Sequence, residues 1–205
     1  MNDYEFTNNW FEINAKGIWD ALLPQLKPTS ILEIGSYEGK SATYLINNSH
    51  WSDTISITCI DTWSGGIEHQ ERKIDMLDVE KRFDNNSDLA LRNSSPNKRI
   101  YKIKNTSDKA LCEIYANTNK EIYDFIYIDG SHQAPDVLSD AILSFKLLKK
   151  GGVIGFDDYL WSENLAYGKD LLRCPKPAID AFINIHFKLI NIIETSNRQI
   201  YIQKK

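Results

Sequence analysis

The chain reads Ile31-Leu32-Glu33-Ile34-Gly35-Ser36-Tyr37-Glu38-Gly39-Lys40-Ser41-Ala42, an apolar run followed by a turn with two glycines. The apolar residues predict a strand that is covered on both faces of a sheet. Gly35 and Gly39 permit a tight turn that brings the backbone close to a bound molecule. Because open α/β sheets bind ligands at the carboxyl ends of their strands, we expect a ligand at this turn.

Predicted strands and helices alternate through the rest of the chain. After the strand at residues 30–35, further strands are expected at residues 55–60, 99–103, 122–128, 153–156, 187–193 and 199–202. The pattern predicts an α/β fold: a Rossmann-like, doubly wound, mostly parallel seven-stranded sheet with helices on both faces. The last two strands are expected to form an antiparallel C-terminal hairpin.

Residues 1–205 are expected to form a single domain. Within it, residues 1–28 are predicted to be an N-terminal helical cap or contact segment, and residues 29–205 the α/β core. Residues 159–176 form a long connection, for which we expect either a lid over the site or an ordered link.

Local sequence signals set three boundaries. Residues 67–92 predict one helix to about Phe83, a break at Asn85-Asn86, and a second short helix. Gly151-Gly152 is interpreted as a left-handed cap that ends the preceding helix. Ser196-Asn197 is expected to be the turn of the C-terminal hairpin.

The composition excludes several classes of partner. The formal net charge of −4 gives no electrostatic case for binding nucleic acid. The densest basic run, Lys98 to Lys104, alternates with apolar residues and is interpreted as a strand with a solvated polar face. No apolar run approaches the roughly 20 residues of a membrane span. The absence of a signal-peptide pattern and of paired cysteines predicts a cytoplasmic protein with reduced thiols.

Acidic residues end four of the predicted parallel strands. They are Glu33, Asp61, Asp129 and the pair Asp157-Asp158. Because parallel strands end at one edge of a sheet, these carboxylates are expected to gather there. Neighbouring carboxylates repel one another, so such a cluster is expected to serve a cation, hydroxyl groups, or both.

Two phosphate-binding readings of the glycine turn fail on spacing. A GxxxxGK[ST] loop requires four residues between its glycines, and here only three separate Gly35 from Gly39. A GxGxxG turn requires glycine where Tyr37 stands. A nucleotide hydrolase that uses Lys40 and Ser41, with Asp129 as a magnesium acid, stays open as an alternative. So does a non-catalytic binding module.

The segment Glu33 to Gly39 resembles the E/D-x-G-x-x-x-G signature of class I S-adenosylmethionine-dependent methyltransferases. The resemblance covers about residues 29–205 and implies S-adenosylmethionine as cofactor. It also implies that Asp61 holds the ribose hydroxyls and that the last strand lies between strands five and six. The implied cofactor-binding residues are Glu33, Gly35, Ser36, Gly39, Asp61, Trp63, Ser107 and Asp129.

A narrower resemblance rests on Asp61-Thr62-Trp63, Ile128 to His132, and Gly151 to Tyr159. These segments look like the macrocin O-methyltransferase group, metal-dependent enzymes that act on sugars of natural products. The resemblance implies that Asp129, Asp157 and Asp158 bind Mg2+, which prefers oxygen ligands. Asp129 and His132 are the candidates for the catalytic base.

The expected partner is a small-molecule hydroxyl acceptor, such as a sugar or glycoside. The oligomeric state is left open by the sequence, and the apolar N-terminal segment is the candidate contact surface of a homo-oligomer.

Overall fold

The computed structural model describes residues 3–67, 73–118, 120–163, 165–193 and 198–205. Its chain divides into two compact units, Met1–Thr106 and Ser107–Lys205, and each unit is described by itself. None of the helices in the described part of the chain has the length and apolar character of a membrane span.

Seven strands form one mixed sheet in the order β3-β2-β1-β4-β5-β7-β6. Their bounds are Ser30–Ile34 (β1), Ser56–Asp61 (β2), Arg99–Lys104 (β3), Tyr123–Ile128 (β4), Leu148–Phe156 (β5), Ile190–Ile193 (β6) and Ile200–Lys204 (β7). The order confirms the predicted Rossmann-like, mostly parallel sheet, and it places the last strand between the fifth and sixth as expected. The predicted hairpin turn at Ser196-Asn197 lies outside the described residues.

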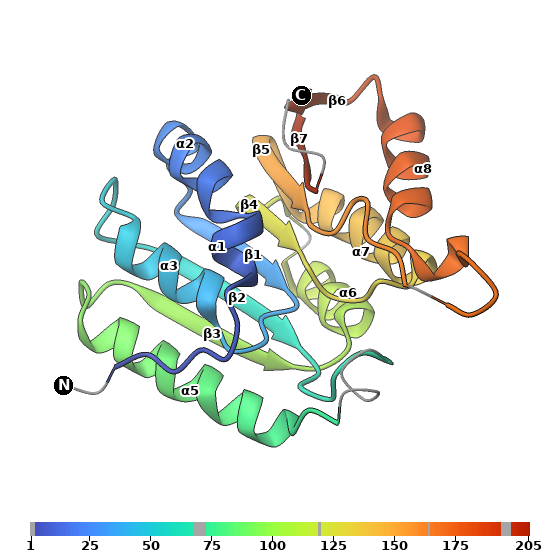
Figure 1. Cartoon of the computed structure of the whole chain (residues 1–205). Helices are drawn as coiled ribbons and strands as arrows, with labels where there is room; N and C mark the ends of the chain where they lie inside the picture. The colour runs from blue at the N-terminus through green and yellow to red at the C-terminus, as the bar shows by residue number, and fades with distance from the viewer. Residues whose placement is uncertain (1–2, 68–72, 119, 164, 194–197) are drawn as a thin grey trace. The chain divides into compact units, whose positions relative to one another are not determined.

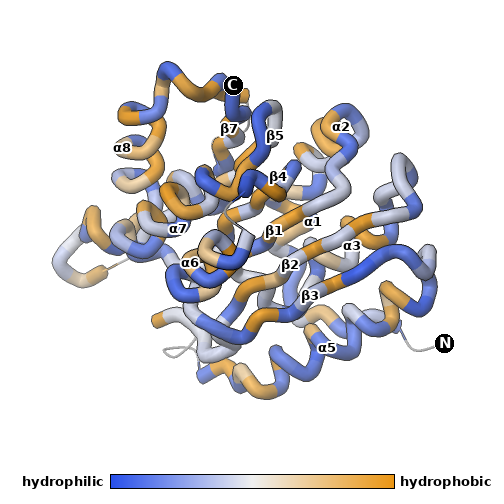
Figure 2. Tube along the Cα trace, turned by 180° about the vertical axis from the view of Figure 1, so that it is seen from behind, coloured by the Kyte–Doolittle hydropathy of each residue, from blue (hydrophilic) through white to orange (hydrophobic). Residues whose placement is uncertain are grey.

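The first unit pairs β1, β2 and β3 in parallel. Its helices are α1 (Trp10–Asn14), α2 (Lys16–Leu26), α3 (Lys40–Asn48) and α5 (Met76–Arg92). Apolar side chains of β1 and β2 are buried, and Figure 2 colours these two strands as mainly hydrophobic. Along α5 the colour alternates between hydrophilic and hydrophobic residues. α3 and α5 run side by side in Figure 1, so their apolar faces turn toward each other and the strands.

The predicted break at Asn85-Asn86 is wrong, because α5 is continuous from Met76 to Arg92. The side chain of Asn86 is buried. It exchanges hydrogen bonds with the backbone of Glu5 and donates to the carbonyl of Glu38 at 3.0 Å. Asparagine often competes with helical backbone bonds, but here its amide is occupied by other segments.

The second unit contains the parallel pair β4 and β5, with β7 antiparallel to β5 and β6 antiparallel to β7. Its helices are α6 (Ser107–Thr118), α7 (Ala134–Leu147) and α8 (Lys176–His186). α7 contacts both α6 and α8, as Figure 1 shows. The connection from β5 to α8 includes a short 3-10 helix, Leu171–Arg173.

The prediction that Gly151-Gly152 caps α7 is wrong. The helix ends at Leu147, and both glycines lie within β5. The register between β4 and β5 shifts in this region, which identifies an irregularity in the ladder. A Cβ at Gly152 would lie 3.0 Å from the Asp124 carbonyl oxygen, so this glycine allows a close approach between the two strands.

The basic run forms strand β3 from Arg99 onward, as predicted, but Lys98, which directly precedes the strand, is not solvated. Lys98 is buried and donates to the carbonyl of Ile46 at 2.7 Å and to the hydroxyl of Ser49 at 2.9 Å. Because Lys98 binds these oxygens at the C-terminal end of α3, it acts as a helix-end partner rather than as a surface charge.

Gly155 is the position in the second unit where an added methyl group is expected to cost most. A Cβ there would lie 2.5 Å from Cε1 of Tyr201, whose ring is fully buried. We expect Gly155→Ala to lower the free energy of unfolding by about 2–3 kcal/mol, as overpacking does. Urea denaturation measures this change.

The matched control is Gly17→Ala in α2, where a Cβ would meet nothing within 4 Å. Alanine is the better helix former, so this control is expected to raise stability by about 0.5–1 kcal/mol. Equal effects of the two substitutions would contradict the packing at Gly155.

Candidate active site

The glycine turn joins β1 to α3 in the first unit. Gly35 and Gly39 have positive φ angles of 84° and 77°, which non-glycine residues rarely adopt. The Gly35 amide donates to the carbonyl of Ile60 on β2 at 2.8 Å, and α3 begins at Lys40. The turn is therefore tied to the end of the neighbouring strand.

Asp61 fixes the same turn from the end of β2. Its Oδ2 atom accepts the backbone N–H groups of Ser36 and Tyr37, each at 2.9 Å. Its Oδ1 atom accepts the backbone N–H of Trp63 at 2.7 Å. A carboxylate has about four acceptor positions, so three protein donors hold this group rigidly and leave room for a further donor.

Glu33 is almost fully buried at the end of β1. Its carboxylate accepts hydrogen bonds from the Ser41 hydroxyl and, at 3.5 Å, from the Cys59 thiol. Burial raises the pKa of the Glu33 carboxyl, and these hydrogen bonds oppose the rise. Ser41 therefore serves Glu33 and is not directed at an external phosphate.

Trp63 packs beneath the turn. Its indole N–H donates to the Tyr37 carbonyl at 2.9 Å, and its ring centroid lies 4.8 Å from that of Phe83. The side chain is 3% exposed. Trp63 therefore holds the backbone of the turn through Tyr37.

Lys40, the most prominent residue of the failed phosphate-loop pattern, points toward the N-terminal segment. Its Nζ atom lies 2.6 Å from a carboxylate oxygen of Glu12 and 3.2 Å from the carbonyl oxygen of Asn8. This placement gives no support to the alternative of a nucleotide hydrolase.

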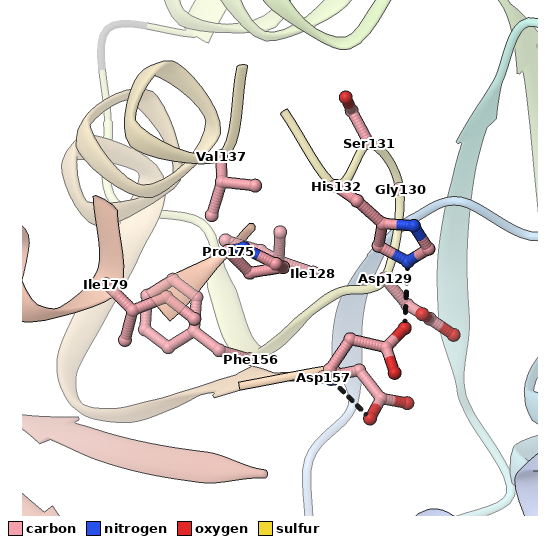
Figure 3. Close-up of a pocket in the computed structure, with 11 residues that line it drawn as sticks. Ile128, Asp129, Gly130, Ser131, His132, Val137, Phe156, Asp157, Pro175 and Ile179 are labelled. Atoms are coloured by element: carbon pink, nitrogen blue, oxygen red, sulfur yellow. Dashed lines mark hydrogen bonds and ion pairs between the residues drawn. The ribbon is translucent and has the colours of Figure 1, made fainter. Parts of the chain in front are cut away.

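The second unit contains a pocket at the ends of β4 and β5, shown in Figure 3. Its polar side carries Asp129, Ser131, His132, Asp157 and Asp158, and in the figure the His132 imidazole points toward the acidic side chains. Its apolar side is formed by Ile128, Val137, Phe156, Pro175 and Ile179. The sheet topology thus brings together the acids that were predicted to follow these two strands.

Asp157 is the most deeply placed acid of this pocket, 9% exposed. It accepts the Tyr127 hydroxyl and, at 2.7 Å, the backbone N–H of Asp158. Behind it, Tyr201 donates to Gln199 at 2.7 Å and Gln199 donates to Tyr127 at 3.0 Å. Burial raises the pKa of Asp157, and the negative charge of Asp158 adds to the rise.

His132 is held from two sides. Its Nε2 atom lies 2.9 Å from Oδ2 of Asp158, and its ring stacks on that of Trp161 with centroids 3.9 Å apart. The arrangement fixes the plane of an imidazole beside the acidic group of the pocket. Such an imidazole can exchange a proton with a bound hydroxyl.

The donor chemistry of the pocket suits a hard divalent cation, since Asp129, Asp157 and Asp158 all offer carboxylate oxygens. However, within the described ranges no three histidine, cysteine or acidic side chains form a group that could hold a metal ion. The predicted metal ligands Asp129, Asp157 and Asp158 therefore line the same pocket, but their carboxylates are not gathered closely enough to form a metal-binding group.

Ser107 begins α6. Asp140 of α7 is 1% exposed, and its Oδ1 atom is buried without a hydrogen-bond partner. Burial raises the pKa of Asp140 from the ordinary value of 3.8 to about 7, and the nearby Ser107 side chain opposes the rise. The sequence predicted Ser107 as a cofactor contact but gave no sign of this buried acid.

This raised pKa predicts a pH-dependent stability. The folded state favours the protonated carboxyl, so the contribution of Asp140 is present below its unfolded pKa and is lost as pH rises toward 7. Each pKa unit corresponds to about 1.4 kcal/mol. We expect Asp140→Asn to raise the free energy of unfolding by about 2 kcal/mol at pH 8 and by much less at pH 4.

The control for this substitution is Asp88→Asn, because the Asp88 side chain is 68% exposed. Urea denaturation at the two pH values is expected to detect no pH-dependent difference for the control. A gain at Asp140→Asn that is equal at both pH values would contradict a buried, titrating carboxyl.

The predicted site residues thus fall into two described groups. The first unit holds Glu33, Gly35, Ser36, Gly39, Asp61 and Trp63 around one turn. The second holds Asp129, His132, Asp157 and Asp158 around one pocket, with Ser107 at the start of α6. Sequence reasoning missed Tyr127 and Gln199, whose sequence neighbourhoods indicate only strands, whereas Trp161 falls in the segment 159–176 that was predicted to be a lid or an ordered link.

Known proteins resemble this chain in sequence and in fold. A family model described as a methyltransferase domain matches residues 32–159. An uncharacterized protein of Acanthamoeba polyphaga mimivirus is 27% identical over 128 residues, which are 62% of this chain and 50% of that protein. The chain therefore spans half the length of this relative.

Two solved structures are similar in fold. The apo structure of CalS11, described as a TDP-rhamnose 3'-O-methyltransferase of calicheamicin biosynthesis, aligns with a TM-score of 0.65 and 14% identity, covering 91% of this chain and 77% of that one. An O-methyltransferase from Bacillus cereus in complex with SAH aligns with a TM-score of 0.58 and 15% identity, covering 99% and 84%.

Proposed function

The chain belongs to the methyltransferase domain family, and on this basis we propose that it is an S-adenosylmethionine-dependent O-methyltransferase. Its acceptor is a hydroxyl of a sugar-like or other polyhydroxylated small molecule. The observation that carries the proposal is the Asp61 carboxylate, which three backbone N–H groups fix beside the glycine turn. A rigid acceptor of this kind suits the ribose hydroxyls of the cofactor.

The cofactor is proposed to bind along the turn. Gly35, Ser36 and Gly39 bring the backbone close to it, Asp61 accepts its ribose hydroxyls, and Glu33 supplies a buried acid beneath the turn. Trp63 supports this surface from below through its bond to Tyr37. Ser107 and Asp129 of the second unit are proposed as further contacts to the cofactor.

The methyl group is transferred by direct displacement. The acceptor oxygen forms a bond to the methyl carbon as the bond from that carbon to sulfur breaks, and S-adenosylhomocysteine leaves. His132, oriented by Asp158 and Trp161, takes the hydroxyl proton as general base, with Asp129 as the other candidate. Much of the rate comes from alignment of the two reactants.

Mg2+ is part of the proposal on chemical grounds. Asp129, Asp157 and Asp158 would hold it through oxygen atoms, which are the ligands it prefers. When bound, the ion would lower the pKa of the acceptor hydroxyl. Burial raises the pKa of Asp157 and the negative charge of Asp158 adds to the rise. A bound cation would relieve this second contribution, the repulsion between the two carboxylates.

The proposal is tested by transfer of a radiolabelled methyl group from S-adenosylmethionine to a panel of sugars and glycosides. We expect labelled O-methyl products with Mg2+ present, and at least a tenfold loss of rate in excess EDTA that Mg2+ restores. Transfer that persists after chelation would remove the metal from the proposal. Labelling of amines or thiols with no hydroxyl product would remove the O-methyl assignment.

We further propose that the protein forms a homo-oligomer through the N-terminal segment and that it acts in the cytoplasm.

A further inference from the structure

The N-terminal residues 3–9, called here the strap, lie against the glycine turn of the first unit. Thr7 contacts Glu38 twice: its backbone N–H donates to Oε2 and its hydroxyl donates to Oε1, both at 2.7 Å. Glu5 exchanges backbone hydrogen bonds with the Asn86 side chain, each at 2.9 Å. Tyr4 and Asn8 make further contacts, with the Asn47 side chain and with Lys40, so the strap is attached at several points along its length.

Glu38 is the residue that joins the strap to the turn. It occupies the last position before Gly39, and its side chain is 2% exposed. Beyond Thr7, it accepts a hydrogen bond and an ion pair from Nε of Arg82 on α5 at 2.6 Å. A buried carboxylate is tolerated only when it is paired and hydrogen-bonded, and these contacts supply both conditions.

One turn of α5 supports the same corner of the backbone. Asn86 donates to the Glu38 carbonyl at 3.0 Å, and Phe83 packs so closely that a Cβ on Gly39 would lie 2.9 Å from its ring. Asp61 fixes residues 36 and 37 through their backbone N–H groups. Residues 38 and 39 are held by different partners, which are α5 and the strap.

We propose that Glu38 is a positioning residue for the cofactor, which clamps the strap and α5 to the glycine turn and thereby sets its shape. The inference rests on the proposed binding of S-adenosylmethionine at this turn. Glu38 does not touch the cofactor in this scheme. It acts through the backbone of the turn, so cofactor affinity depends on the N-terminal strap.

The test compares three variants by calorimetric titration with S-adenosylhomocysteine. Glu38→Gln keeps the shape but places an amide N–H₂ group against donors, and we expect its Kd to rise about tenfold. Thr7→Val keeps the backbone bond and removes the hydroxyl, and we expect a rise of about threefold. The matched control is Asp88→Asn on α5, which breaks an exposed ion pair to Arg92 and is expected to leave Kd unchanged.

Two further readouts separate positioning from general stability. The unfolding of each ligand-free variant is followed in urea, and Thr7→Val is expected to lose affinity with its urea midpoint nearly unchanged. In the methyl-transfer assay, Glu38→Gln is expected to raise KM for S-adenosylmethionine about tenfold with kcat within about twofold.

The outcomes distinguish this inference from the proposed function. If the wild-type chain does not bind S-adenosylhomocysteine, the proposed function fails and the inference fails with it. If the wild type binds and Glu38→Gln and Thr7→Val bind equally well, only the positioning role is overturned. An equal loss in Asp88→Asn would also overturn it, because the effect would then not depend on Glu38.

Discussion

Replacing Asp61 with asparagine is expected to weaken the binding of S-adenosylhomocysteine about 100-fold. The carboxylate accepts three backbone N–H groups and, in the proposed complex, ribose hydroxyls as well. An amide has one oxygen, so its N–H₂ group must face at least one of these donors. Hydrogen bonds to a charged acceptor contribute about 1.5–3 kcal/mol each, which accounts for an effect of this size.

The control is Asp53→Asn, because Asp53 is exposed and precedes the start of β2, whereas Asp61 ends that strand. Calorimetric titration of the control is expected to match the wild type. Asp61→Asn is also expected to lower the free energy of unfolding by about 1–3 kcal/mol, since one backbone donor loses its partner. Unchanged affinity in a folded Asp61→Asn protein would remove Asp61 from the cofactor site.

Replacing His132 with glutamine is expected to lower kcat for methyl transfer by about 10²–10³, which lies in the lower part of the usual range for loss of a general base. The Asp158 contact at 2.9 Å and the stack on Trp161 hold the imidazole in one plane. Glutamine can replace the hydrogen bond but cannot take up the proton. Because the proposed ribose contact is made by Asp61, binding of S-adenosylhomocysteine is expected to stay within about twofold of the wild type.

The control for this second substitution is His50→Gln, since His50 is exposed in the turn after α3. It is expected to leave both kcat and cofactor affinity unchanged. If His132→Gln keeps wild-type kcat, then Asp129 becomes the candidate base. Parallel losses of kcat and cofactor affinity would instead indicate that His132 supports the fold of the pocket.

The positions of the strands were predictable because a continuous run of apolar residues is typical of a buried parallel strand. The segment 30–35 and the acid at position 61 were both placed correctly from sequence, since buried parallel strands lack polar alternation. The same signal supported the resemblance to class I methyltransferases, which the family match over residues 32–159 confirms.

Local signals failed where distant contacts decide the structure. Asn86 looked like a helix break, but its amide is taken by Glu5 and Glu38, which are 81 and 48 residues away. Gly152 looked like a helix cap, but it serves the close approach of β5 to Asp124. Neither contact can be derived from the residues next to it in the chain.

The positions of the acidic residues in the site were predictable from the sequence, whereas the residues that hold them in place were not. Asp157 follows a strand and so could be expected at the sheet edge. Tyr127 on β4 accepts a hydrogen bond from Gln199, which directly precedes β7, and the two residues are 30 and 42 positions away from Asp157 in the chain. The sequence around Asp157 gives no sign of either contact. Glu38 was read only as part of a glycine signature, because its partners Thr7 and Arg82 belong to other elements.

Calorimetric titration of the wild-type chain with S-adenosylhomocysteine tests most directly whether the glycine turn binds the cofactor of methyl transfer. We expect saturable binding of one equivalent with a Kd in the micromolar range, about −8 kcal/mol, that Asp61→Asn weakens about 100-fold. No binding at millimolar ligand by the folded wild-type protein would contradict it.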